Sequence, residues 1–102
     1  MKLGSQARGT IDLPIAASAG HKVKQLLIHL ERGDGADVRV LAITDDGTSR
    51  VIIHGPDTTN ENVPPQLIGE RRFTLRIEAA NPHAKPMLIL TALALNITIA
   101  PL

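Results

Sequence analysis

The chain has 102 residues, of which 43% are apolar and 21% are charged, and its formal net charge is +1. This length suits one compact domain covering residues 1–102, and the composition excludes a disordered chain. The absence of cysteine excludes disulfides, thiol catalysis and cysteine-bound metals. The near-neutral charge disfavours nucleic acid and any other partner that is bound mainly through its negative charge.

Apolar and polar residues alternate with a period of two, which is typical of strands with one buried face. The expected strands cover residues 10–15, 23–30, 37–44, 50–54, 72–79 and 87–99. Pro14 limits the first of them to a sheet edge or a strand end. In the second, Leu26, Ile28 and Leu30 share one side, and Val23 is expected on the opposite side. The strand at 72–79 has the clearest pattern, with a buried face formed by Phe73, Leu75, Ile77 and Ala79.

Turn residues separate these strands. Residues 33–35 (Gly-Asp-Gly) and 45–48 (Asp-Asp-Gly-Thr) are expected to form tight hairpins, because glycine accepts a positive φ. Residues 55–66 are polar, contain three prolines and are predicted to form a long loop. With residues 81–86 as the last connection and no amphipathic helix, the sequence predicts an all-β fold, an antiparallel, jelly-roll-like β-sandwich in a single domain.

The last expected strand, residues 87–99, is apolar on both faces in its first half. A strand of a two-layer sandwich has one face in water, so Leu88 and Leu90 need another cover, which a neighbouring subunit or a folded-back loop would supply. The sequence therefore predicts an interface that includes Met87, Leu88, Leu90 and Ala92. The alternative is a break near Ala92 into two shorter strands in different sheets. The apolar run is too short for a membrane-spanning helix, so no membrane partner is predicted.

Two kinds of metal site are alternatives to a metal-free protein. The four histidines lack metal-ligand spacing, but His29 and His54 could be cross-strand neighbours in a zinc site. Four aspartates could bind calcium if the two hairpin turns lay side by side; they are Asp34, Asp37, Asp45 and Asp46. Hydrogen-bonded histidines and turn-forming aspartates explain the same residues, so the prediction is no metal and no cofactor.

Catalysis and ligand stacking find little support in the sequence. The three serines, Ser5, Ser18 and Ser49, lie in no nucleophile motif, and we therefore predict that the chain is not an enzyme. Phe73 is the only aromatic residue, so no platform exists for stacking sugars or bases. Basic residues on several strands form either a basic stripe or, as we favour, charges that oppose edge-to-edge aggregation. These residues are Lys22, Lys24, Arg39, Arg50, Arg71, Arg72 and Arg76.

In size, strand rhythm and polar proline-rich loop, the chain resembles small jelly-roll-like proteins of phage particles, in particular capsid decoration (cement) proteins. The resemblance covers residues 10–99 and carries over no functional residue. It implies a non-enzymatic virion component that self-associates and clamps neighbouring capsid subunits, with the virion as its location. A second class of function is a glycan-binding or host-attachment module, and the cytoplasm is the alternative location.

A rigid loop is a suitable arm for such a partner, because it loses little entropy on docking. The loop at 55–66 contains Pro56, Pro64 and Pro65, which restrict its backbone, and it also contains Asn60. These four residues complete the predicted interface. The predicted partners are other copies of the chain and a capsid or other virion protein.

Overall fold

The computed structural model describes residues 1–33, 35–55, 59–63 and 71–102. These residues form nine strands and no helix, so none of them belongs to a helix that could cross a membrane. The strands are β1 (Lys2–Leu3), β2 (Arg8–Ala16), β3 (His21–Arg32), β4 (Asp37–Thr44), β5 (Ser49–Gly55), β6 (Thr59–Val63), β7 (Arg72–Ala80), β8 (Met87–Leu88) and β9 (Leu90–Pro101). The expected all-β class is confirmed.

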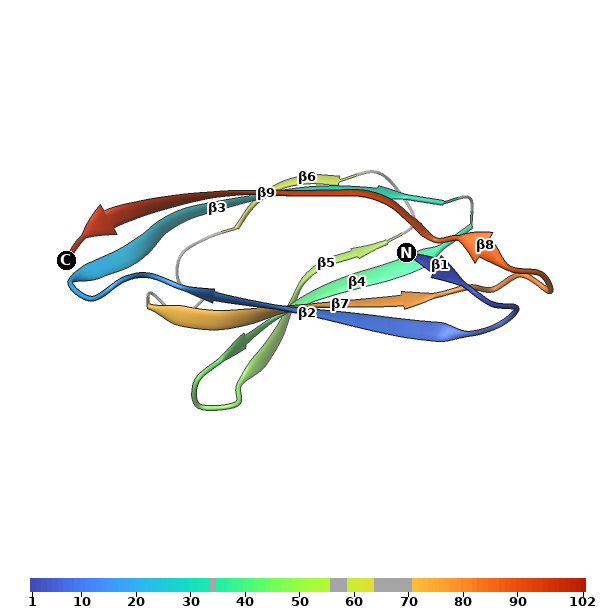
Figure 1. Cartoon of the computed structure of the whole chain (residues 1–102), viewed down its shortest axis with the longest axis horizontal. Coiled ribbons are helices and arrows are strands. Elements are labelled where there is room, and N and C mark those ends of the chain that lie inside the picture. The colour runs from blue at the N-terminus through green and yellow to red at the C-terminus, as the bar shows by residue number, and fades with distance from the viewer. Residues whose placement is uncertain (34, 56–58, 64–70) are drawn as a thin grey trace.

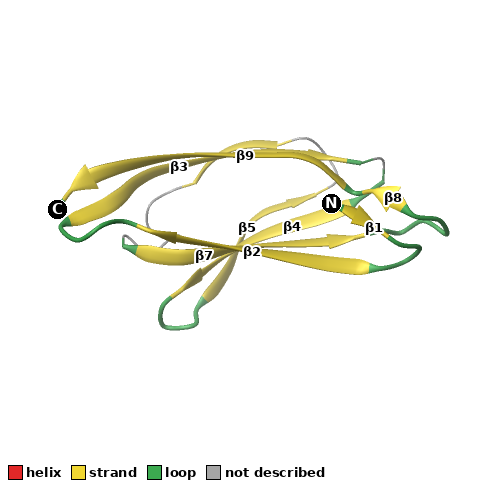
Figure 2. Cartoon of the chain, viewed as in Figure 1, coloured by secondary structure: helices red, strands yellow, loops and turns green. Residues whose placement is uncertain are grey.

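The strands pair antiparallel in three sheets, with the orders β1-β8, β2-β7-β4-β5 and β6-β3-β9. Figure 1 shows the three-stranded sheet above the four-stranded sheet in an elongated body, which measures 49 × 24 × 18 Å along its principal axes. Figure 2 shows that most of the connecting turns lie towards the ends of this body. The pair β1-β8 lies at the end opposite the C-terminus (Figure 1).

The pairings are nested in the chain. β4 pairs with β5, β3 with β6, β2 with β7, and β1 with β8, so each pair encloses the previous one in the sequence. Two further pairings, β4 with β7 and β3 with β9, join these hairpin-like pairs into the larger sheets. The described pairs are therefore nested around the β4–β5 turn, as in one long hairpin.

The apolar core lies between the two larger sheets, and both contribute to it. From β7 it receives Phe73, Leu75, Ile77 and Ala79, each at most 4% exposed, as the alternation predicts. The three-stranded sheet contributes residues that are at most 2% exposed, namely Val23, Leu26, Ile28, Leu30 and Val63. Burial of apolar area at about 25 cal/mol per Å² is the dominant favourable term for such a core.

One core residue lies on the side opposite to that predicted. Val23 is buried with Leu26 and Ile28, because the pairing of β3 with β9 shifts register between Val23 and Gln25. An extra residue in one strand reverses the alternation beyond it, so a single β-bulge moves Val23 from the outer to the inner face. Pro14 behaves as predicted, since β2 is the edge strand of its sheet.

Two of the expected connections are different in the structure. Residues 33–35 do not join a hairpin, because β3 and β4 belong to different sheets and the chain crosses between them there. The segment at 55–66, predicted to be a loop, contains β6, which pairs with β3 from Leu26 opposite Val63 to Leu30 opposite Thr59. Its polar sequence concealed the strand, because ladder hydrogen bonds come from the backbone and require no apolar side chain.

The turn at 45–48 is a hairpin between β4 and β5, as predicted. Gly47 has a φ of 86°, and the amide of Thr44 donates to the carbonyl of Thr48 at 2.9 Å. Asp46 Oδ1 accepts hydrogen bonds from the Thr44 hydroxyl at 2.6 Å and from the Thr48 amide at 2.9 Å. The Thr44 hydroxyl first, and then the Thr48 amide and hydroxyl, lower the pKa of Asp46 from 3.8 to about 2.

We expect this turn to weaken in acid. A folded pKa below the unfolded value gives stability that is present above pH 3.8 and is lost as the pH falls towards 2. The difference in free energy of unfolding between the wild type and Asp46→Asn should therefore narrow from pH 5 to pH 2 in denaturant titrations. A constant difference over this range, with a carboxyl chemical shift of Asp46 that titrates near 4, would contradict the assignment.

The apolar run near the C-terminus breaks at Ile89 instead of Ala92. β8 pairs with β1, β9 pairs with β3, and Ile89 between them donates its amide to the Met1 carbonyl at 2.9 Å. The break allows two consecutive side chains to turn inward, so Ile89 is fully buried and Leu90 is 6% exposed. Leu90 was expected to need a neighbouring subunit or a folded-back loop as a cover, and this is corrected, because the core of the chain already covers it.

Candidate functional site

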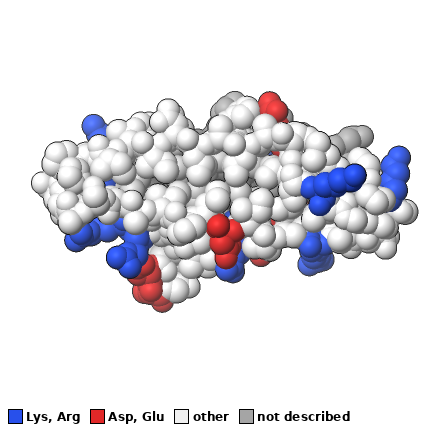
Figure 3. Space-filling model, viewed as in Figure 1, with Lys and Arg blue, Asp and Glu red and all other residues white. Residues whose placement is uncertain are grey.

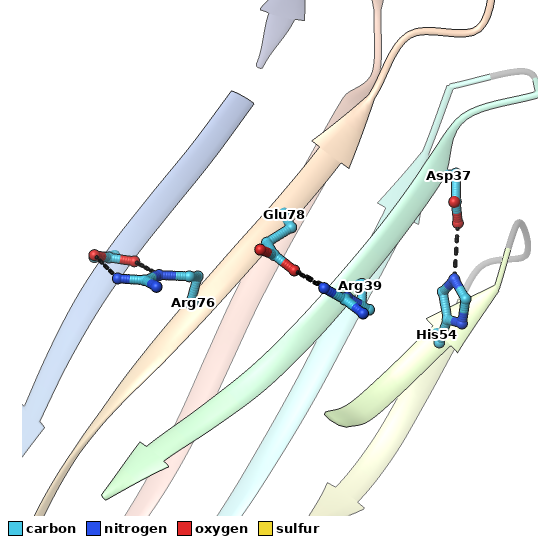
Figure 4. Close-up of polar contacts among 6 residues, drawn as sticks. Asp37, Arg39, His54, Arg76 and Glu78 are labelled. Atoms are coloured by element: carbon cyan, nitrogen blue, oxygen red, sulfur yellow. Dashed lines mark hydrogen bonds and ion pairs between the residues drawn. The ribbon is translucent and has the colours of Figure 1, made fainter. Parts of the chain in front are cut away.

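The outer face of the four-stranded sheet carries a row of charged side chains. In Figure 4, Arg76 and Glu78 come from β7, Arg39 and Asp37 from β4, and His54 from β5. The register places Asp12 opposite Arg76 and Arg39 opposite Glu78. Opposite charges directly across an antiparallel pair attract each other, so the row is a ladder of cross-strand ion pairs.

The charged groups of these pairs are joined by hydrogen bonds. Arg76 Nε and Nη2 donate to the two carboxylate oxygens of Asp12 at 2.8 and 3.0 Å, and Arg39 Nε donates to Glu78 Oε1 at 2.9 Å. The hydrogen bond from Arg76, together with its charge, lowers the pKa of Asp12, while the same pair raises the pKa of Arg76. The Asp12–Arg76 pair therefore favours its ionised form, and both ion pairs lie between neighbouring strands of the sheet.

The basic stripe that the sequence left open does not form on this face. Each of Arg39, Arg72 and Arg76 lies within 4 Å of a carboxylate, with Arg72 Nε 3.8 Å from Asp45. Figure 3 shows basic and acidic groups scattered over the visible face without a large patch of one sign. These three arginines lie on β4 and β7, the inner strands of the sheet, so the interpretation that strand charges oppose edge-to-edge aggregation stays a prediction.

A shallow hollow of about 360 Å³ opens at one end of this charged row. Its polar lining includes Arg8, Thr10, Asp37, Arg39, His54 and Glu78. His54 Nε2 lies 3.1 Å from Asp37 Oδ1, so part of this lining is already hydrogen-bonded. Polar side chains make up most of the lining, and none of the lining residues is Phe, Tyr or Trp.

The residues weighed as metal ligands are separated in space. His29 is on β3 and His54 on β5, in different sheets, so they are not cross-strand neighbours. Asp37 begins β4, whereas Asp45 and Asp46 follow its other end, so the two turns do not meet. Among the described residues, no group of three or more histidine, aspartate or glutamate side chains could hold a metal ion; Asp34 lies outside them.

The predicted interface residues fall into two groups. In β8 and β9, Leu88 is 52% exposed, while Met87 and Ala92 are partly buried. In the other group, Asn60 belongs to β6, and Pro56, Pro64 and Pro65 lie outside the described residues. Met87 and Leu88 lie in β8, Ala92 lies in β9 of a different sheet, and Leu90 is turned into the core.

The sequence reasoning missed the outer edge of β9. The side chains of Ala94, Asn96 and Thr98 are exposed, and Ile99 is 42% exposed. No charged residue occurs from Leu88 to Leu102, and this signal was visible in the sequence. Figure 3 shows a mostly uncharged surface in the region where Figure 1 draws β9.

Asn81 was also missed. It is 2% exposed and is the one buried polar residue in the described part of the chain. Its side-chain amide donates to the carbonyls of Leu3, Gly4 and Lys85 at 3.2, 2.8 and 2.9 Å, and its Oδ1 accepts from the His83 amide at 2.9 Å. Asn81 therefore fastens the β1–β2 turn to the connection before β8.

The chain was compared with known protein families and with curated proteins. No family model matches the sequence, and no curated protein matches it.

Proposed function

We propose that this chain is a non-enzymatic structural protein of a virus particle, which stabilises a capsid by binding other copies of itself and the shell. The observation that carries the proposal is the uncharged surface along β8 and β9. Its exposed apolar groups include Leu88 and Ile99, at 52% and 42% exposure, and no charge interrupts them from Leu88 to Leu102. An uncharged surface with exposed apolar side chains is suited to a protein partner held by shape and burial.

A jelly-roll-like β-sandwich is the fold that we propose for this role. The nested pairing of β1 with β8, β2 with β7, β3 with β6 and β4 with β5 supports it, because a jelly roll is a long hairpin rolled into two sheets. The core shared by the two larger sheets also supports it. Jelly rolls are common in capsid and lectin domains, so the fold by itself does not choose between them.

The second candidate is a glycan-binding or host-attachment module. The polar hollow of about 360 Å³ beside Arg39, His54 and Glu78 favours it, because such groups can hydrogen-bond to sugar hydroxyls. The lack of Phe, Tyr and Trp in its lining weighs against it, since sugar rings are commonly held on the faces of such side chains. We therefore place this candidate second.

The test uses particles that contain the protein. We expect particles stripped of it to break at a lower temperature, and re-added wild-type protein to restore their resistance. Leu88→Asp should bind these particles at least tenfold more weakly, because a charge placed in an apolar contact must be desolvated. The matched control is Val51→Asp on β5. Val51 is about as exposed as Leu88, at 49%, and lies in the four-stranded sheet, away from β8 and β9 in the order of the strands.

Equal binding by the two variants would contradict a contact through Leu88. Stripped particles that are as heat-resistant as intact ones would contradict the shell function. A glycan array then decides on the second candidate, with Arg39→Ala as the variant that should lose any sugar bound in the hollow.

A further inference from the structure

Among the residues that the structure describes, the outer edge of β9 has a partner at one position, Leu90. The Met1 amino group donates to the Leu90 carbonyl at 2.8 Å, and the Leu90 amide donates to the Met1 carbonyl at 3.3 Å. From Ala92 to Pro101, β9 pairs with β3 on its inner edge, and from Thr91 to Pro101 it pairs with no described residue on its outer edge. Successive residues of a strand direct their N–H and C=O groups to opposite edges, so about half of these eleven residues present donors and acceptors that a further strand would satisfy.

The other sheet edges are protected in ways that β9 is not. β2 has Pro14 and Asp12, and β5 has the basic residue Arg50. In sequence, β6 contains Glu61 and is followed directly by two prolines. Proline and charge are the usual means by which edge strands avoid pairing, and β9 lacks both until Pro101.

The side chains of β9 also leave apolar area uncovered. Leu93, Leu95 and Ile97 pack against the core but are only partly buried, and Ile99 is 42% exposed. On the outward face, Ala94, Asn96 and Thr98 are small and uncharged. A strand added at this edge would cover the apolar side chains from Leu93 to Ile99 on the inward face. On the outward face it would meet no bulky or charged side chain.

We infer that β9 pairs antiparallel with β9 of a second copy of this chain, about a two-fold axis at Asn96. The inference rests on the proposed self-association and specifies the strand and the register through which two copies would bind. The free edge runs from Thr91 to Pro101, and its midpoint is Asn96. An axis at a residue, rather than between two residues, keeps inward side chains opposite inward ones, as the two-residue period of a strand requires.

This register is self-complementary. On the inward face Leu95 lies opposite Ile97 of the second copy, and Leu93 lies opposite Ile99, so apolar groups cover apolar groups. On the outward face, Ala94 lies opposite Thr98, and Asn96 meets its own copy at the axis. No charged residue opposes another, which is the arrangement that directly opposed strands need. A two-fold contact uses the same patch twice, and β9 meets this requirement by itself.

The experiment introduces single cysteines into the full chain, which has none of its own. The three matched positions, Ala94, Asn96 and Thr98, are exposed and lie on one face of β9. Opposed residues have Cα atoms about 4.5–5.5 Å apart, within the range for a disulfide. Residue 94 of one copy lies opposite residue 98 of the other, so the two residues 94 are offset by four positions along the strand, and so are the two residues 98. This offset is about 14 Å, which is too far for a disulfide.

Asn96→Cys should therefore form a disulfide-linked dimer under mild oxidation, while Ala94→Cys alone and Thr98→Cys alone should not. An equimolar mixture of Ala94→Cys and Thr98→Cys should form the mixed disulfide, because the axis brings 94 of one copy to 98 of the other. Circular dichroism establishes that each variant keeps its sheet structure. Light scattering of the wild type should give twice the 10.9 kDa of one chain.

A wild-type mass of one chain, or equal cross-linking of all three single variants, overturns the inference. Cross-linking of the shell protein to Asn96→Cys in place of the second copy also overturns it. A monomer that still protects particles overturns the β9 pairing and leaves the shell function intact. A dimer with the expected disulfides that neither binds nor protects particles supports the pairing and overturns the shell function.

Discussion

Gly33→Ala is expected to destabilise the fold by about 3 kcal/mol, the upper part of the range for overpacking. A Cβ at this position would overlap the carbonyl oxygen of Leu88 and lie 3.1 Å from its carbonyl carbon. Both are backbone atoms, and the Gly33 amide donates to the Ile89 carbonyl at 2.7 Å, so the two segments cannot separate without breaking that bond. The end of β3 and the β8–β9 junction would have to move apart.

The control is Gly4→Ala, because a Cβ at Gly4 has no atom within 4 Å. Its free energy of unfolding should stay within about 0.5 kcal/mol of the wild type, as for ordinary surface substitutions. Urea unfolding of the two variants at neutral pH is the measurement. Equal stability of Gly33→Ala and Gly4→Ala would show that the junction does not approach Gly33 this closely.

Asn81→Asp is expected to be at least as damaging as Gly33→Ala, although it keeps the size and shape of the side chain. The carboxylate would lose the donations to the carbonyls of Leu3, Gly4 and Lys85 and would place a negative charge against them. Leaving a buried charge without compensation costs about 3–5 kcal/mol. Asn81→Ala, which leaves the carbonyls unpaired without adding a charge, should cost about 1–3 kcal/mol.

The pH dependence separates the two variants. Burial and the neighbouring carbonyls would raise the pKa of the introduced carboxyl in the folded state above its unfolded value of about 3.9. The penalty is then largest at neutral pH and shrinks as the pH falls through the raised folded pKa towards 3.9. Denaturant unfolding from pH 7 to pH 4 should therefore bring Asn81→Asp closer to Asn81→Ala. Parallel curves would contradict the burial of this side chain.

Local patterns in the sequence predict part of this fold. The alternation in residues 72–79 gives the buried face of β7, Pro14 marks an edge strand, and Gly47 marks a hairpin. Each of these depends on a few neighbouring residues, so the sequence displays it directly.

Features that depend on distant segments could not be read in this way. The inward position of Val23 requires the bulge against β9, and the burial of Leu90 requires the break at Ile89, which the Met1 and Gly33 hydrogen bonds hold. β6 is polar and is a strand only because β3 lies beside it. No local pattern carries this information.

The candidate surfaces divide in the same manner. The uncharged stretch from Leu88 to Leu102 is visible in the sequence, but the open edge of β9 follows only from the order of the sheets. The pairs Asp12–Arg76 and Arg39–Glu78 join residues 64 and 39 positions apart, so they emerge only from the register. The exposed position of Leu88 beside the buried Leu90 likewise requires the break between them.

The nested pairing also determines the order in which the chain can fold as it is synthesised. β4 and β5 are adjacent in the sequence and can pair as soon as both have left the ribosome. β3 must wait for β6, β2 for β7, and β1 for β8, so the first strands made are the last to be paired. Until those partners are made, the apolar sides of β2 and β3 lack their native cover, and all four strands of the larger sheet are synthesised before β9.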